Sequence, residues 1–237
     1  MSKGEAEAMI DTVTIEGPTG LPFHIPGGGG RREQDARVGM GSIFGRRYGM
    51  DADYSYPRAV PEEVSSILDL GINLGAYTVW ACLAWWPGRI KRVHAYDPNP
   101  IALPIARRNC EIAGLPVEFT QAALGAGDTV VFYQDEDLGS ASTYWQKDPT
   151  SVGVQVAAVR AEELPPADVL KADIEGSAHH LTGYRHWGGV KVCAYESHHA
   201  HERDTMAKLC AGAGLTMVRG NPDNPANDSR VWVRVPA

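Results

Sequence analysis

The stretch SILDLGINLGAYTV, residues 66–79, decides the expected fold. Its apolar first part predicts a buried strand, and its last part predicts the start of a helix. Gly71 allows a sharp turn between the two, and Gly75 allows the helix to pack closely on its strand. A dinucleotide-binding turn has a further glycine between them, so that a pyrophosphate can lie against bare backbone. Asn73 stands there instead, which predicts a ligand without a pyrophosphate but with an amino-acid end that forms hydrogen bonds.

Strands alternate with helices from residue 64 onward. We expect strands at residues 65–70, 91–97, 117–124, 129–135, 152–159, 167–175, 189–197, 215–220 and 230–235, with helices from residue 76 and at 101–113, 177–186 and 202–213. This alternation predicts an α/β fold with a mostly parallel sheet covered on both faces. Ligands of such sheets bind beyond the carboxyl ends of the strands. Four strand ends are acidic, and they are Asp69, Asp97, Asp173 and Glu196.

The first sixty residues differ from the rest and form a separate expected unit, residues 1–60, before a main domain at residues 61–237. TVTIE and LPFHI, separated by GPTG, predict a β-hairpin. A glycine run at 27–30 predicts a flexible hinge. Tyr48, Tyr54 and Tyr56 either form part of a mobile lid over the ligand or seal the core of the hairpin.

Composition excludes several classes of protein. The formal net charge of −7 over 237 residues gives no general attraction to nucleic acid. Four cysteines without a C-x-x-C pair favour reduced, buried thiols in a cytoplasmic protein. The longest apolar run, residues 76–86, is shorter than the roughly 20 residues that cross a bilayer, and the polar N-terminus is unlike a signal peptide. We therefore expect no membrane and no nucleic-acid partner, and the sequence indicates no oligomeric state.

S-adenosylmethionine is the ligand that fits the first turn. Asp69 is placed for its cationic methionine end, directly or through water. Asp97 follows the turn by about 20 residues, where an acid accepts hydrogen bonds from ribose hydroxyls, and Pro98 frees its carboxylate by ending the strand. A helix N-cap is the alternative role of Asp97. We expect Gly71→Val to abolish cofactor binding with only a modest loss of stability.

Four motifs in order resemble the FkbM-like methyltransferases, a branch of the class I S-adenosylmethionine-dependent enzymes. They are DLGINLGAY (69–77), YDPNP (96–100), AALGAGD (122–128) and KADIEG (171–176). The resemblance implies a Rossmann-like seven-stranded sheet and S-adenosylmethionine as cofactor. The cofactor contacts it implies are Asp69, Gly71, Asn73, Gly75, Tyr77, Asp97, Pro98, Ala122, Ala123 and Asp173. The family's last motif usually continues to a glutamate, which Ser177-Ala178 lacks.

Asp173 and Glu175 are the first candidates for catalysis. They are two residues apart as the chain leaves its strand, so both carboxylates can face the same side, toward the methyl group in this fold. The alternative is structural, with Lys171 and Glu175 pairing with neighbours to brace the loop.

ESHHAHE, residues 196–202, supplies the remaining candidates. It could be a metal site, a proton-accepting cluster or the polar start of a helix. His198 and His199 are candidates for a general base, because histidine titrates near neutral pH. We expect no metal, since His198 and His201 are three residues apart rather than the four typical of a metal-binding helix.

The function that these features predict is methylation of a hydroxyl on a small molecule, such as a sugar, a polyketide or another natural product. Two alternatives remain open. One is an RNA or protein methyltransferase, although ADIEGS does not resemble the N-P-P-Y-like motif of enzymes that methylate nucleic-acid bases. The other is a module that binds S-adenosylmethionine without catalysis.

Overall fold

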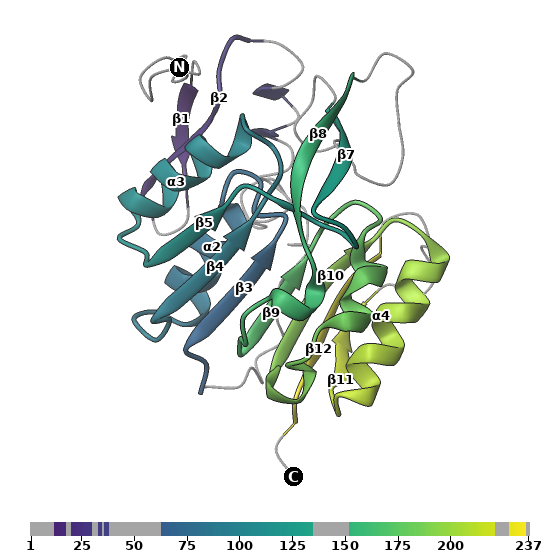
Figure 1. Ribbon diagram of the computed structural model, residues 1–237. Helices are drawn as coiled ribbons and strands as arrows, with labels where there is room; N and C mark the ends of the chain where they lie inside the picture. Colours follow the sequence, from purple (N-terminus) through teal and green to yellow (C-terminus); the bar gives the residue numbers. More distant parts are fainter. Residues whose placement is uncertain are drawn as a thin grey trace.

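The computed structural model describes residues 12–17, 20–29, 33–34, 36–37, 63–134, 152–220 and 228–235. Within them, a seven-stranded sheet has the order β11-β12-β10-β9-β3-β4-β5 (Figure 1). Its strands are β3 (Ser66–Leu70), β4 (Arg92–Tyr96), β5 (Val117–Thr120), β9 (Val169–Ala172), β10 (Val192–Ser197), β11 (Thr216–Arg219) and β12 (Asp228–Val233). All pairings are parallel except those of β12, which lies antiparallel between β10 and β11. The expected class I, Rossmann-like fold is confirmed.

The strand order reverses between β3 and β9. The chain runs outward from β3 through β4 to β5, and it returns to add β9 and β10 on the other side of β3. Asp69 pairs in register with Lys171, so the two strands end side by side. A crevice for a ligand is expected at such a reversal, beyond the carboxyl ends of the strands.

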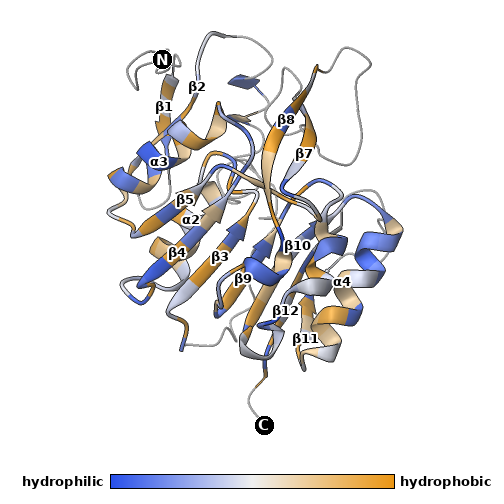
Figure 2. Cartoon of the chain, viewed as in Figure 1, coloured by the Kyte–Doolittle hydropathy of each residue, from blue (hydrophilic) through white to orange (hydrophobic). Residues whose placement is uncertain are grey.

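Helices cover both faces of the sheet because the strands are apolar on both sides. α2 (Ala76–Trp80) continues as a π-helix, η2 (Ala81–Trp85), and α3 (Ala102–Ile112) packs beside it. α4 (Ala200–Gly212) lies over β10. Figure 2 shows apolar residues along the central strands and hydrophilic stretches on α3 and α4. All five residues of β3 are buried, so the first turn starts from a fully enclosed strand.

Two smaller sheets accompany the main one. β1 (Thr12–Glu16) and β2 (Pro22–Pro26) form the expected antiparallel hairpin. β6 (Ala123–Leu124), β7 (Thr129–Gln134) and β8 (Val152–Val159) form the other. The single strand expected at 117–124 is wrong, because the chain leaves the main sheet after Thr120 and Ala123 pairs with Ala158.

One predicted helix takes another form. The α-helix expected at 177–186 is replaced by two 3₁₀-helices, η4 (Ala178–Gly183) and η5 (Trp187–Gly189). Glycine disfavours a longer α-helix, and Gly183, Gly188 and Gly189 interrupt this segment. The helix expected at 202–213 is confirmed as α4, beginning two residues earlier.

Part of the expected N-terminal unit lies outside the described residues. This applies to Gly30, to Tyr48, Tyr54 and Tyr56, and to most of residues 1–60, so the mobile lid stays a prediction. All four cysteines are buried and free of disulfides, as expected. None of the helices in the described ranges has the length and hydrophobicity to cross a bilayer.

Candidate functional site

The turn after β3 is built from residues with left-handed backbone conformations. Gly71, Asn73 and Gly75 have φ angles of 78°, 50° and 84°. The amides of Gly71 and Ile72 both donate to the carbonyl of Tyr96, at 2.8 and 3.2 Å. A left-handed conformation is costly for a residue with a side chain. Asn73 and Glu175 are the non-glycine residues that adopt it in the described part of the chain, and both lie at this edge of the sheet.

Packing within the protein requires a glycine at position 71. A Cβ there would lie 1.8 Å from the carbonyl oxygen of Asp173, which crosses the turn. The expectation that Gly71→Val would cost little stability is therefore wrong. At Gly75 a Cβ would lie 3.4 Å from the Ala106 carbonyl oxygen and the Cys110 sulfur, so this glycine faces α3 rather than its own strand.

Lys171 ties the turn to the end of β9. Its ammonium lies 3.3 Å from the Asp69 carboxylate and 3.9 Å from that of Asp173, and it donates to the carbonyl oxygens of Leu70 and Gly71. Burial lowers the pKa of Lys171, but Asp69 and Asp173 raise it by more, so the lysine stays charged. This is the bracing role that the sequence left as an alternative.

Asp69 is buried and contacts other residues of this protein. The side chain is fully buried, and Thr78 donates to its other oxygen at 2.7 Å. Its partners are thus Lys171 and Thr78, both from this chain. A direct contact with a cationic ligand would have to compete with them.

Asp97 closes the turn from the end of β4. Its carboxylate accepts from the amide of Asn73 and from that of Asn99, both at 2.8 Å. Asn99, rather than Asp97, accepts from the amides at the start of α3, those of Ile101 and Ala102, at 2.9 and 3.4 Å. Burial raises the pKa of Asp97 to about 6, against the lowering effect of the two backbone hydrogen bonds. The carboxylate is therefore held at the expected position at an electrostatic cost.

The Asn73 side chain offers a buried acceptor beside Asp97. Its Oδ1 atom is buried and has no hydrogen-bond partner among the described residues. Buried polar atoms are normally bonded, so this oxygen is a candidate acceptor for a donor from a ligand. This agrees with the hydrogen-bonding role expected for Asn73.

The remaining expected cofactor residues fall into two groups. Pro98, Ala122 and Ala123 lie along the same edge as Asp97, whose amide donates to Thr120 at 3.2 Å. Ala122 and Ala123 are buried there. Tyr77 is also buried, but it packs in the core between α2 and the sheet. The side chain therefore belongs to the core, and the cofactor contact that the resemblance implied stays a prediction.

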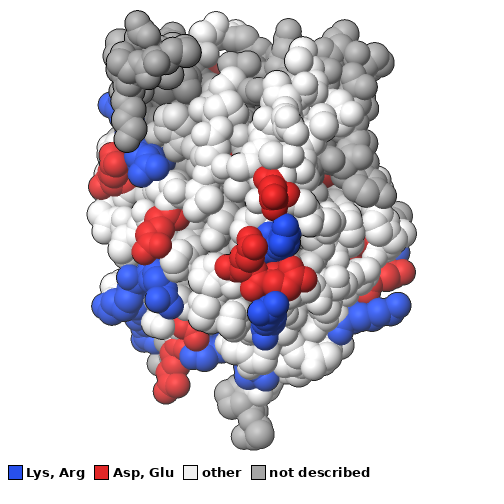
Figure 3. Space-filling view, in the orientation of Figure 1, with Lys and Arg blue, Asp and Glu red and all other residues white. Residues whose placement is uncertain are grey.

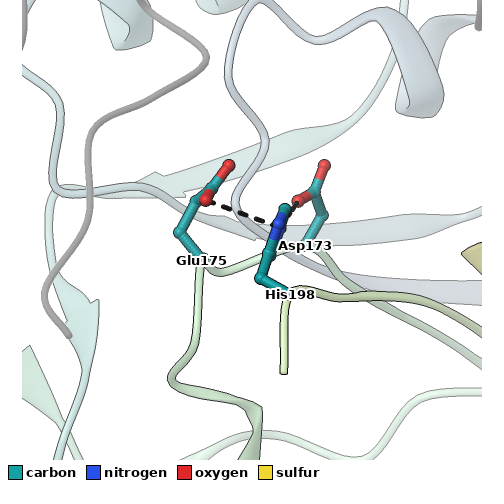
Figure 4. A group of neighbouring side chains, drawn as sticks. All are labelled: Asp173, Glu175 and His198. Carbon is teal, nitrogen blue, oxygen red and sulfur yellow. Dashed lines mark ion pairs between the residues drawn. The ribbon is translucent and has the colours of Figure 1, made fainter. Parts of the chain in front are cut away.

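Asp173, Glu175 and His198 come together at the ends of β9 and β10 (Figure 4). The Nε2 atom of His198 lies 3.8 Å from an Asp173 oxygen and 3.5 Å from a Glu175 oxygen. Burial lowers the pKa of His198, but Asp173, Glu175 and Glu196 raise it to about 9 overall. Near neutral pH the ring is then protonated, so His198 in this arrangement is a poor general base.

His199 lies apart from this group. It precedes α4 at the N-cap position, and its ring stacks on that of His201 with the centroids 5.5 Å apart. Burial lowers the pKa of His199, so its ring is neutral near pH 7.

Glu202 is a positioning residue that the sequence analysis missed. It is fully buried in the first turn of α4 and accepts from the amides of Ala178, at 2.8 Å, and His198, at 3.1 Å. It therefore joins the loops that follow β9 and β10. The signal was present in ESHHAHE, where an acid four residues after His198 can reach back to its amide.

The distribution of charge on one face can be followed for the described residues. On the face in Figure 3, acidic and basic side chains of the described residues are intermixed. An interface for nucleic acid instead needs clustered lysine and arginine.

Comparisons with known proteins show a distant likeness of fold. A scan against models of protein families finds no match, and a search of curated proteins finds none either. Among solved structures, precorrin 8W decarboxylase from Methanobacterium thermoautotrophicum is 14% identical, with a TM-score of 0.43 over 74% of this chain and 84% of the other. Ribosomal protein L11 methylase from Lactobacillus delbrueckii subsp. bulgaricus is 11% identical, at 0.44 over 89% and 81%. Precorrin-6y C5,15-methyltransferase from Geobacter metallireducens is 10% identical, at 0.42 over 90% and 94%. At these values the function has to be argued from the site.

Proposed function

We propose that this protein is an S-adenosylmethionine-dependent methyltransferase that methylates a hydroxyl group of a small molecule. The observation that carries the proposal is the pair formed by Asp97 and Asn73 at the reversal point of the sheet. One offers a buried carboxylate at the end of β4, and the other offers a buried oxygen without a partner among the described residues. A ligand with ribose hydroxyls and an ammonium group would donate to both.

The residues of the turn fit this cofactor. The Asn73 oxygen would accept from the ammonium of the methionine end. The Asp97 carboxylate has lone pairs beyond those used by two backbone amides and would accept from the ribose hydroxyls. Pro98, Ala122 and Ala123 provide a mostly apolar edge beside Asp97 for the adenine. When bound, S-adenosylmethionine would supply a methyl group activated by a sulfonium.

Asp173, Glu175 and His198 line the same edge and would face the acceptor. In the overall reaction an O–CH₃ bond replaces an O–H bond, the carbon–sulfur bond breaks with its electron pair on sulfur, and the proton passes to solvent. Orientation of the two reactants can lower the barrier by about 7–11 kcal/mol. A general base typically raises the rate by a smaller factor, about 10²–10⁴. We therefore assign most of the rate to the shape and rigidity of this edge.

Two measurements together test the proposal. Calorimetric titration with S-adenosylmethionine and S-adenosylhomocysteine should show one site per chain. A screen of hydroxylated metabolites with methyl-labelled cofactor should transfer label to at least one of them. Absence of binding to the folded protein would refute the cofactor assignment. Binding without transfer to any hydroxyl, RNA or protein acceptor would favour a non-catalytic module.

A further inference from the structure

We propose that Asp173, Glu175 and His198 form a site for one divalent metal ion. The three side chains come from two loops, since Asp173 and Glu175 follow β9 and His198 follows β10. One ligand atom from each lies within 4.8 Å of the others. The proposal reverses the expectation of no metal, which considered only spacing along the chain.

The distances between the three side chains leave room for a shared cation. Two ligands of an octahedral cation with bonds near 2.1 Å are about 3.0 Å apart when adjacent and about 4.2 Å when opposite. The separations of 3.5 and 3.8 Å from His198 Nε2 to the carboxylate oxygens lie between these two values, so small movements of the side chains would bring each pair to either one. A charge-assisted hydrogen bond between the same groups would be about 2.7–2.9 Å long. The three side chains are therefore close enough together to share one ion.

The charges at this edge also favour a cation. Lys171 is shared between Asp69 and Asp173, and Glu175 adds a third carboxylate beside His198. With His198 neutral, these groups sum to a charge of −2. A divalent ion would balance it and would take the place that a proton on His198 otherwise fills.

The backbone around the ligands is fixed in advance. Buried Glu202 binds the amides of Ala178 and His198, which holds the two ligand-bearing loops together. Lys171 holds Asp173 against the first turn. Such outer contacts orient the ligands of a metal and raise its affinity.

The ligand set indicates the kind of ion and its role. Two carboxylates and one imidazole suit an ion such as Mn²⁺, and three protein ligands leave positions for water or an acceptor oxygen. The side chains of Asp173, Glu175 and His198 are 29%, 17% and 11% exposed, so an ion can enter from solvent. A hydroxyl bound to the ion would lose its proton more readily. Only this role toward the acceptor rests on the proposed methyl transfer.

Titration with Mn²⁺, followed by the electron paramagnetic resonance signal of the free ion, tests the site directly. The chelator-treated full-length protein should bind one Mn²⁺ per chain with a Kd below about 100 μM. Glu175→Gln and His198→Gln should each weaken binding by more than about tenfold. These variants are preferable to Asp173→Asn because Asp173 also pairs with Lys171. Thermal unfolding would confirm that each variant is folded.

Glu118→Gln is the matched control. Glu118 lies 3.2 Å from His94, and this acid–imidazole pair is not part of the possible metal-binding group found within the described residues, so its loss should leave the Mn²⁺ affinity unchanged. A Kd for Mn²⁺ above about 1 mM in the wild-type protein would overturn the proposal. So would a Kd in Glu175→Gln and His198→Gln that equals that of the wild type. Either result would leave the cluster as an ion pair around a protonated His198.

The outcome is independent of the cofactor assignment. Mn²⁺ binding is measured without S-adenosylmethionine, and cofactor binding is measured without Mn²⁺. If Mn²⁺ binds and the cofactor does not, the proposed function fails and the metal site stands. If the cofactor binds and Mn²⁺ does not, the metal site fails and the proposed function stands.

Discussion

Asp97→Asn separates the ligand role of Asp97 from its structural role. The substitution keeps the size of the side chain and removes its charge. Asp97 accepts hydrogen bonds from the amides of Asn73 and Asn99 in this protein, and we propose that it also accepts from the ribose hydroxyls of the cofactor. We expect the variant to remain folded and to bind S-adenosylmethionine roughly 10- to 150-fold more weakly, because a charge-assisted hydrogen bond is worth about 1.5–3 kcal/mol.

The effect on stability should be small because two terms oppose each other. Burial raises the pKa of Asp97 to about 6 from an ordinary value of 3.8, and this difference corresponds to about 3 kcal/mol against the charged form at pH 7. Asparagine removes that cost. It also places an NH₂ group against one of the two backbone amides, which costs about 1–3 kcal/mol. The free energy of unfolding should therefore change by less than about 2 kcal/mol.

Calorimetry with S-adenosylmethionine and urea unfolding, both at pH 7, measure the two quantities. Asp128→Asn is the control, since Asp128 forms an exposed ion pair with Arg160 away from the turn, and both quantities should match the wild type. If the folded Asp97→Asn protein binds the cofactor within twofold of the wild type, the ribose assignment is wrong. A large loss of stability with unchanged affinity for the cofactor would show that Asp97 stabilises the turn and does not bind the cofactor.

Three further predictions follow from the same edge of the sheet. The affinity of the wild type for S-adenosylmethionine should fall by up to tenfold per pH unit below about pH 6, as Asp97 becomes protonated, and Asp97→Asn should lack this component in calorimetry between pH 5 and 7. The sign is opposite for stability, where the raised pKa favours the folded state at low pH and this contribution is lost as pH rises through about 6. Gly71→Ala should lower the melting temperature strongly, because its Cβ would overlap the Asp173 carbonyl; a melting temperature within 2 °C of the wild type would contradict this. Lys171→Met should cost about 3–5 kcal/mol in urea unfolding, because it leaves Asp69 buried beside Thr78 alone, whereas Lys91→Met, which removes an exposed lysine, should be nearly neutral.

The sequence by itself determined the order of the elements and the position of the first turn. Alternating strand and helix patterns predicted β3, β4, α3, β9, β10 and α4, and the turn at Gly71–Gly75 was found from its glycines. These features are local, because periodicity and turn chemistry are set by residues a few positions apart. The strand pattern also predicted that the acidic residues at the strand ends lie at one edge of the sheet, because parallel strands present their carboxyl ends there.

Tertiary structure alone decided what the residues at that edge contact. Gly71 is needed because Asp173, about one hundred residues later, crosses it, and Asp69 is engaged by Lys171 from the neighbouring strand. His198 meets Glu175 only because β10 pairs with β9. Strand pairing brings together residues far apart in the chain, and no local pattern records which of them will meet. The sequence could therefore predict where a ligand would bind, and only the packed sheet decided which side chains remain available to bind it.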